Sequence, residues 1–461
     1  MPAVPRALAL LTTSTLAALA LAPVPGASAR AGIGAPDGLR ATPQRGFVTH
    51  GVRGRLHHGV TARAAQAAAP DPRAGEQWPL QGDGPMGIDS AWRQTTGADV
   101  TVAIVDSGID LGHPDLAPNL WTNPGEIAGN GVDDDHNGYV DDVHGYDFVD
   151  WDGTPQDANG HGTHVAGIVG ARGGNGIGVA GVAWRARLMA VRVLDRQARG
   201  TTTAVAEGLR YAVDNGARIV NLSLAGPTST PDLEEAVRYA QDRGVLVVVA
   251  AGNDGADLAV APTFPAAYAE ANVLGVAATT RDGGLSGVSD YGPGADLAAP
   301  GEEILSTALG GGYEWRTGTS MAAPQVAGTL VLLAAARPGL DAGALRAALL
   351  AGVRHTGLPV QAGALDAAAA LRSVIAPGAW RSGPADPLSS YDATGAARPA
   401  KQPAAKPATK ARQRRSAAAR RKAAVAARKK ARARARARIR ARRAAARRAG
   451  ARRRAGVSAR A

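Results

Sequence analysis

The sequence predicts a doubly wound α/β domain, with a mostly parallel sheet between flanking helices, followed by a disordered basic tail. Short β-branched apolar runs such as VTVAIVD (100–106) are typical of parallel strands buried on both faces. Stretches with helical spacing separate them, and alternation of strand and helix implies a doubly wound sheet. In such sheets, ligands bind at the carboxyl ends of the strands.

The expected elements follow in order along the chain. The first strand, 100–106, precedes a helix at AVAEGLRYAVDNG and a second strand at 218–224. A helix at PDLEEAVRYAQDRG leads to strands at 245–251 and 272–278. Both helices end at glycine, a preferred C-terminal stop.

Composition bounds the class of protein. A chain of 461 residues with 45% apolar content can bury a large core and carry extensions. The absence of cysteine excludes disulfides, thiolate nucleophiles and cysteine metal sites. Residues 398–461 hold 26 basic and no acidic residues, which leaves 26 basic and 39 acidic residues before them, a formal charge of −13. The chain is therefore an acidic body joined to a cationic appendage.

The N-terminus has the pattern of a secretory signal. An early Arg, an apolar stretch over about 7–22 and the small-residue site Ala27-Ser28-Ala29 predict export with cleavage near Ala29. An uncleaved anchor is disfavoured, because the apolar stretch is short for a bilayer and contains threonines.

Segment boundaries follow from changes in composition. Residues 30–69 are rich in Arg, Gly and Ala, and the stretch after Ile375 is rich in Pro, Ala, Gly and Ser, which suits an extended linker. The predicted segments are a signal peptide (1–29), a short pro-segment or disordered leader (30–69), a catalytic domain (70–375), a linker (376–400) and a basic tail (401–461).

Three motifs carry candidate chemistry. Asp106 ends the first predicted strand, where a carboxylate can cap a turn or serve a site. In NGHGTHVAGIVG, His161 and His164 precede a small-residue helix pattern without the H-E-x-x-H arrangement of a zinc site, so one can be a general base and the other structural. In RTGTSMAAPQVAG, Ser320 opens a helix, as an N-cap or as a nucleophile beside a free backbone N–H. A nucleophilic Ser needs a base and an orienting carboxylate, which His161 and Asp106 supply.

The segments VAIVDSGID, HGTHVAGIVG and GTSMAAPQVAG resemble the active-site motifs of subtilisin-like serine proteases, the subtilases, over about residues 70–375. The resemblance implies that Ser320 is the nucleophile, His161 the general base and Asp106 the carboxylate that orients it. His164 is then structural. VVVAAGNDG resembles the oxyanion segment of the family, which implies that Asn253 stabilises the oxyanion together with the Ser320 N–H.

The resemblance also implies a substrate cleft in which an extended peptide adds as a strand. NLSLAGP places Ser223, Leu224 and Ala225 on one wall of the primary pocket. TFPAAY resembles the opposite wall, with Thr263 near the floor and Pro265 as a candidate cis-proline.

An acidic insertion spans residues 121–160, with ten Asp/Glu and no Lys/Arg. The spacing of Asp133, Asp135, Asn137, Gly138 and Asp141 resembles the front of an EF-hand loop, without its final Glu. We expect a structural Ca²⁺ loop, and a merely solvated loop is the alternative.

The family resemblance implies a second Ca²⁺ site near the start of the domain. Asp71, Asp115 and Asn175 match its side-chain ligands, and Ile177 and Val179 are candidate carbonyl ligands. No catalytic cofactor is expected.

The expected function is a secreted, monomeric serine endopeptidase acting on proteins or peptides through an acyl-enzyme. The tail lacks aromatic residues, so sequence-specific nucleic-acid binding is not expected. We expect electrostatic binding to anionic cell-surface polymers or other polyanions, with a removable solubility tail as the alternative. Two other functions stay open: a non-catalytic binding module, and a polyanion-binding protein on a subtilase scaffold.

Overall fold

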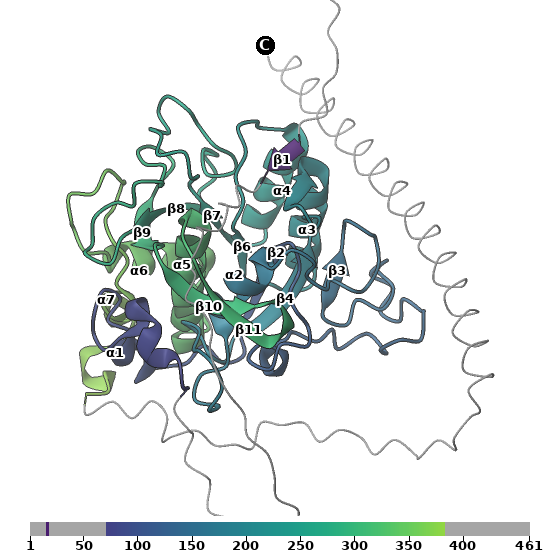
Figure 1. Cartoon of the computed structure of the whole chain (residues 1–461), viewed down its shortest axis with the longest axis horizontal. Helices are drawn as coiled ribbons and strands as arrows, with labels where there is room; N and C mark the ends of the chain where they lie inside the picture. The colour runs from purple at the N-terminus through teal and green to yellow at the C-terminus, as the bar shows by residue number, and fades with distance from the viewer. Residues whose placement is uncertain (1–14, 18–70, 383–461) are drawn as a thin grey trace, which may run out of the picture.

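The computed structural model describes residues 15–17 and 71–382, and its centre is one large sheet (Figure 1). The strand order is β3-β4-β2-β6-β7-β8-β9, and every neighbouring pair is parallel. The strands are Thr101–Asp106 (β2), Gly145–Asp147 (β3), Arg187–Arg192 (β4), Ile219–Leu222 (β6), Leu246–Ala250 (β7), Val273–Thr279 (β8) and Leu297–Pro300 (β9). The doubly wound α/β prediction is confirmed, and the four expected strands are β2, β6, β7 and β8.

Seven α-helices flank this sheet within the described residues. They are Ile88–Trp92 (α1), His161–Gly170 (α2), Thr202–Asp214 (α3), Pro231–Gln241 (α4), Thr319–Ala336 (α5), Ala342–Ala351 (α6) and Ala367–Val374 (α7). Single 3₁₀ turns lie at Ala74–Glu76, Trp78–Leu80, Ala117–Asn119, Leu309–Gly311 and Pro377–Ala379. The two helices expected from periodicity are α3 and α4.

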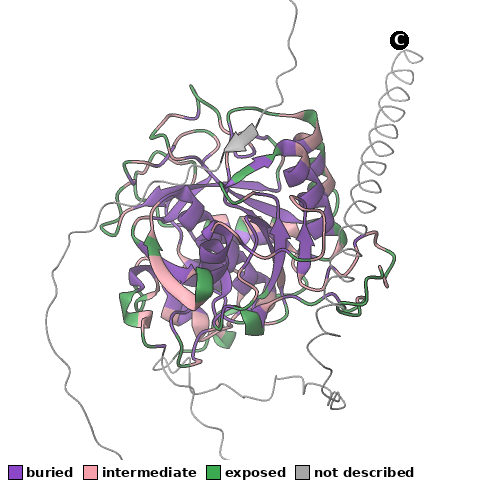
Figure 2. Cartoon of the chain, turned by 45° about the vertical axis from the view of Figure 1, so that its right-hand side comes forward, coloured by how far each residue is buried: buried purple, intermediate pink, exposed green. Residues whose placement is uncertain are grey.

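Both faces of the sheet are covered, which explains the continuous apolar runs of its strands (Figure 2). Successive side chains of a strand point to opposite faces. Leu246 and Val248 of β7 belong to the core formed with α2 and α5, whereas Val247 and Val249 belong to the core formed with α3 and α4. Each face therefore has its own hydrophobic core.

Helix α5 is the central core helix. It is the one described helix long and apolar enough to span a membrane, yet 89% of that stretch is buried inside the body. A helix that is apolar all round is typical of a buried core. Gly328 permits its close packing, because a Cβ there would lie 2.6 Å from Cβ of Val182.

The remaining strands form two antiparallel pairs. Ile304–Ala308 (β10) pairs with Gly312–Arg316 (β11), and this hairpin leads directly into α5. Thr15–Ala17 (β1) pairs with Arg199–Thr201 (β5).

Several predicted segments lie outside the described residues. They are the leader at 30–69, the basic tail at 401–461, the linker beyond Ser382, and the signal peptide apart from Thr15–Ala17. The boundaries assigned to these segments stay predictions.

Candidate active site

The carboxyl end of β2 meets the first turn of α2. Asp106, the last residue of β2, is completely buried, and His161 is the first residue of α2. Nδ1 of His161 lies 2.8 Å and 2.9 Å from the two carboxylate oxygens of Asp106. Since a carboxylate accepts hydrogen bonds, Nδ1 carries a proton and Nε2 is left for proton exchange.

Gly162 and the carboxylate of Asp157 allow the end of β2 and the start of α2 to pack closely. A Cβ on Gly162 would lie 2.2 Å from the carbonyl oxygen of Gly108, so only glycine fits at the second position of α2. Asp157 is buried and accepts five hydrogen bonds, from the hydroxyls of Ser107 and Thr163 and the N–H groups of Asn159, Gly160 and Thr163. This carboxylate holds the start of α2 against the residue that follows Asp106. Sequence reasoning missed it, although an Asp ahead of a helix start is a capping signal.

Ser320 is the second residue of α5, where a backbone N–H has no intrahelical partner. Its hydroxyl donates to the carbonyl of Ser223, at 3.2 Å, and the Ser223 hydroxyl donates to the carbonyl of Ser320, at 2.9 Å. Among the described residues, no hydrogen bond joins the Ser320 hydroxyl to His161. Catalytic hydrogen bonds are often unformed before substrate binds.

Asn253 follows β7 and contacts the residue before Ser320. Its amide oxygen accepts the N–H of Thr319, at 2.8 Å, and the Thr319 hydroxyl, at 3.0 Å. A Cβ on Gly318 would lie 3.1 Å from this oxygen, so glycine leaves room for the amide. Because the amide oxygen is held by Thr319, its NH₂ group is available to a ligand.

The two predicted walls of the substrate pocket lie side by side. Gly226 and Phe264 exchange backbone hydrogen bonds of 3.0 Å and 2.8 Å, which join the segment after Ser223 to the segment after Thr263. The Phe264–Pro265 peptide is cis. The Thr263 hydroxyl donates to the carbonyl of Ala251, so its proton is already used, and its oxygen can only accept a hydrogen bond from a substrate group.

The side chains of the first wall differ in exposure. Ala225 is partly exposed, whereas Leu224 is 2% exposed and belongs to the core under α3 and α4. Leu224 can therefore line a pocket through its backbone, whereas its side chain packs in the hydrophobic core.

His164, one turn after His161, is fully buried. Its Nε2 lies 3.1 Å from the carbonyl oxygens of both Ile304 and Glu314, so Nε2 donates to the β10–β11 hairpin. Burial, aided by the charge of Arg316, lowers the pKa of His164 to about 3. A neutral, tethered imidazole fits a structural role.

Comparison with known proteins identifies the family. The model of the subtilase family matches residues 97–367, more than half of the chain. The chain belongs to the subtilase family. Thermitase from Thermoactinomyces vulgaris is 44% identical to this subtilase over 268 residues, which cover 58% of this chain and 86% of thermitase. Subtilisin BL from Lederbergia lenta is 42% identical over 246 residues, which cover 53% of this chain and 80% of subtilisin BL.

A solved structure agrees with this assignment. A protease of Pseudoalteromonas arctica PAMC 21717 aligns with a TM-score of 0.57 and 30% identity, over 67% of this chain and 99% of that chain. This subtilase is therefore a serine endopeptidase that hydrolyses protein or peptide substrates, as the motifs predicted.

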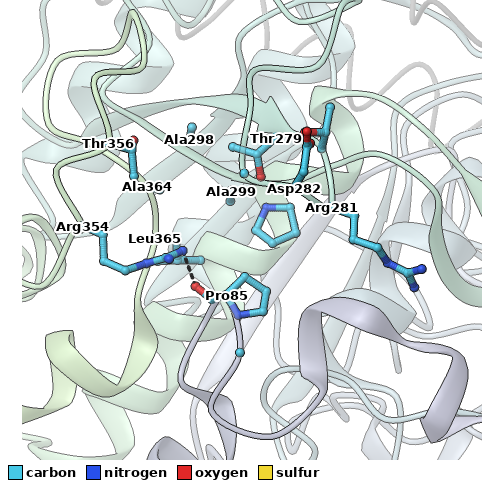
Figure 3. Close-up of a pocket in the computed structure, with 14 residues that line it drawn as sticks. Pro85, Thr279, Arg281, Asp282, Ala298, Ala299, Arg354, Thr356, Ala364 and Leu365 are labelled. Carbon is cyan, nitrogen blue, oxygen red and sulfur yellow. Dashed lines mark hydrogen bonds between the residues drawn. The ribbon is translucent and has the colours of Figure 1, made fainter.

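The subtilase also has a cavity of about 260 Å³ at the carboxyl ends of β8 and β9 (Figure 3). Thr279, Arg281 and Arg354 line it, and Arg354 donates to the carbonyl of Pro85, at 2.6 Å. None of the predicted site residues lines this cavity. The candidate active site is thus placed by its convergent polar groups rather than by this cavity.

Asp71, Asp115 and Asn175, predicted as metal ligands, come together in this subtilase. Asp71 accepts the N–H of Asn175, at 3.0 Å, and Asp115 accepts the Asn175 side-chain amide, at 2.7 Å. Asp115 also accepts the Val179 N–H and the Tyr313 hydroxyl, both at 3.0 Å. Burial, together with the charge of Asp115, raises the pKa of Asp71 to about 6, and burial also raises the pKa of Asp115.

In the acidic insertion, a different set of residues converges from the one that spacing predicted. Oxygen atoms of Glu126, Asp133 and Asp135 all lie within 4.8 Å of one another. One carboxylate oxygen of Asp133 is buried and has no hydrogen-bond partner within the part of the chain that the structure describes. Glu126 was not anticipated, because it lies seven residues before Asp133, outside the EF-hand spacing.

The other two predicted ligands of the insertion are not members of this converging group. Asp141 accepts the N–H groups of Gly129, Asn130 and Gly131, at 2.8, 3.1 and 3.0 Å, and so closes the loop around itself. Asn137 donates its side-chain amide to Asp135, at 3.0 Å, and so contacts one member of the converging group.

Proposed function

We propose that this subtilase is an exported serine endopeptidase that cleaves peptide bonds through Asp106, His161 and Ser320. The observation that carries the proposal is the His161 imidazole, held by both oxygens of the buried Asp106 at the start of α2, a helix that packs against the helix bearing Ser320. Such an arrangement leaves one imidazole nitrogen to take up the proton of a nucleophile.

The proposed reaction has two halves. Ser320 Oγ attacks the scissile carbonyl carbon while its proton passes to His161 Nε2, and Asp106 stabilises the resulting imidazolium. The Asn253 side-chain amide and the Ser320 N–H donate to the oxyanion. The C–N bond then breaks as His161 returns its proton to the amine, and water hydrolyses the acyl-enzyme by the same sequence.

Single and double substitutions test this mechanism. Ser320→Ala and His161→Ala should each abolish nearly all peptidase activity, and the double variant should be little worse, because the pair acts as a unit. Labelling of Ser320 by a serine-directed phosphonate should be lost in His161→Ala. Retained activity in Ser320→Ala would overturn the proposal. Asn253→Ala should lower kcat by ~10²–10³, a magnitude measured on a subtilisin rather than worked out from this structure.

We infer further that structural Ca²⁺ stabilises the domain. Carboxylate, amide and carbonyl oxygens are the ligands that Ca²⁺ prefers. The unpartnered buried oxygen of Asp133 fits a cation held with Glu126 and Asp135. The raised pKa values of Asp71 and Asp115 fit a second cation, since buried carboxylates are stabilised by a positive charge. Ca²⁺ would supply folding stability at both places.

Thermal unfolding in the inactive Ser320→Ala background tests the metal proposal without self-digestion. Excess chelator should lower the Tm, and Ca²⁺ but not Mg²⁺ should restore it; ligand at 100 times its Kd adds ~2.7 kcal/mol to the free energy of unfolding. Asp133→Asn with Asp135→Asn should weaken the response. Asp134→Asn, a matched control outside the converging group, should not. An unchanged Tm in chelator would favour a merely solvated loop.

We also propose the segment order of the mature protein. Cleavage near Ala29 would export a monomer whose domain is followed by a linker and a basic tail, and the tail would retain it on anionic cell-surface polymers. The signal pattern and the 26 basic residues of 398–461 support this proposal. Intact mass and N-terminal sequencing of the secreted protein test it, and an unprocessed N-terminus would contradict it.

A further inference from the structure

A buried carboxylate lies beside the proposed oxyanion donor. Asp290 is 1% exposed and lies in the loop between β8 and β9. Its backbone N–H donates to the carbonyl of Gly252, at 3.0 Å. One of its carboxylate oxygens, Oδ1, accepts the N–H groups of Asp254, at 2.9 Å, and Ala256, at 2.8 Å. Asp290 therefore bonds to the residue on each side of Asn253.

Backbone hydrogen bonds also join the residues that follow Asn253 to the residues around Asp290. The N–H of Gly255 donates to the carbonyl of Val288, and the N–H of Tyr291 donates to the carbonyl of Ala256, both at 3.0 Å. The loop that carries Asn253 is thus fixed along its length against residues 288–291, and the Asp290 carboxylate is the side-chain part of this contact.

The glycine before Asn253 lets the carboxylate come close. Gly252 has a φ of +127°, and a Cβ there would lie 1.9 Å from Asp290 Oδ2. Any other residue would force apart the backbone of the loop and the carboxylate. The N–H of Gly252 donates to the Thr319 hydroxyl, at 3.2 Å. Gly252 therefore also links the loop to the residue before Ser320.

We propose that Asp290 is a positioning residue that fixes the backbone of Asn253 so that its amide is aimed at the oxyanion. The proposal rests on the function proposed for Asn253. The amide oxygen of Asn253 is held by Thr319, but that bond fixes only the end of the side chain. Asp290 holds the backbone of the residues on both sides of Asn253, Gly252 and Asp254. An oxyanion donor must be in place before charge develops.

The chemistry of Asp290 suits this role better than a role in stability. Burial, aided by the charge of Asp254, raises the pKa of Asp290. Its second oxygen, Oδ2, has no hydrogen-bond partner among the described residues. Burying a carboxylate with an unused oxygen is costly, so a neutral loop anchor would serve stability better. A carboxylate oxygen, however, accepts two N–H bonds in a stronger, charge-assisted form.

A double-mutant cycle tests the proposal with the full chain and a chromogenic peptide substrate. Asp290→Ala should lower kcat ~10–100-fold with KM within about twofold, because the oxyanion exists only after attack. Asp290→Ala added to Asn253→Ala should lower kcat by less than about threefold, since the donor is already absent. Asp290→Asn keeps an acceptor oxygen and should retain most of kcat.

Asp296→Ala is the matched control. Asp296 is also a buried carboxylate, which accepts the backbone N–H of Gly275, at 2.9 Å, and pairs with Arg346, at 2.6 Å. Within the part of the chain that the structure describes, no hydrogen bond joins its side chain to the loop that carries Asn253. This variant should lower the Tm and leave kcat within about twofold. If Asp290→Ala does not fold, Asp290→Ser replaces it in the cycle.

The outcomes distinguish the positioning role of Asp290 from the oxyanion role of Asn253. Multiplicative losses in the double variant, or an unchanged kcat in Asp290→Ala, would overturn the positioning role while leaving Asn253 as oxyanion donor. Full activity in Asn253→Ala would instead overturn the oxyanion assignment, and the positioning role with it.

Discussion

His164 should make the folded protein sensitive to acid. Its pKa falls from 6.5 to about 3 on folding, because the buried ring cannot accept a proton in its place between α2 and the β10–β11 hairpin. Between these pH values the unfolded chain binds a proton that the folded chain does not. Stability is therefore present above pH 6.5 and is lost as the pH falls from 6.5 towards 3.

The expected magnitude follows from the pKa difference. Each pH unit below 6.5 lowers the free energy of unfolding by ~1.4 kcal/mol, so the loss due to His164 between pH 7 and pH 5 is about 2 kcal/mol. Asp71 and Asp142, with pKa values raised to about 6, act in the opposite direction over part of this range. Comparing two variants that share both carboxylates removes their contribution.

Urea unfolding at several pH values measures the effect. The comparison is Ser320→Ala against Ser320→Ala with His164→Gln, where glutamine offers an N–H donor that does not titrate. The parent should lose about 2 kcal/mol more than the His164→Gln variant between pH 7 and pH 5. Equal losses in both would refute the buried neutral imidazole.

Three further perturbations have definite expected results. Asp157→Ala leaves five donors without their acceptor and should lower the free energy of unfolding by about 3–5 kcal/mol in urea titrations, and a change under 1 kcal/mol would contradict the inferred network. Gly162→Ala forces a Cβ to 2.2 Å from the Gly108 carbonyl, so phosphonate labelling should slow at least ~10-fold; an unchanged rate would show that the contact relaxes freely. Deleting 398–461 should leave hydrolysis of a neutral peptide intact and abolish salt-sensitive retention on a polyanion column, whereas equal elution of both forms would exclude the tail as a binding element.

The fold was accessible from the sequence because its strands are buried on both faces. The runs that became β2, β6, β7 and β8 are short, β-branched and apolar throughout, and few structures besides a doubly covered parallel sheet produce that pattern. The same topology explains why Asp106, Ser223 and Asn253 lie at the same edge of the sheet, since each follows or ends a parallel strand.

The residues that sequence reasoning missed share a physical property. Glu126, Asp157 and Asp290 all accept backbone N–H groups, those of Asp134, Thr163 and Asp254 among them. Asp157 lies just ahead of its helix, where the sequence does carry a capping signal, whereas Asp290 meets N–H groups from a segment more than 30 residues earlier in the chain. A backbone N–H belongs to every residue but proline, so the sequence carries no mark of which one a distant carboxylate will meet. Asp141 shows the reverse case: its spacing matched a ligand pattern, but three nearby N–H groups occupy it.

The imidazole of His164 joins two parts of the chain, α2 and the β10–β11 hairpin, whose positions would otherwise be set independently. Its own helix begins with His161, and the hairpin that it bonds at Glu314 runs on to Ser320 six residues later. The tether thus links the helix that begins at the proposed base to the hairpin that leads to the proposed nucleophile, and it resists a shift of one relative to the other. A residue outside the proposed triad therefore helps to maintain the relative placement of its base and its nucleophile.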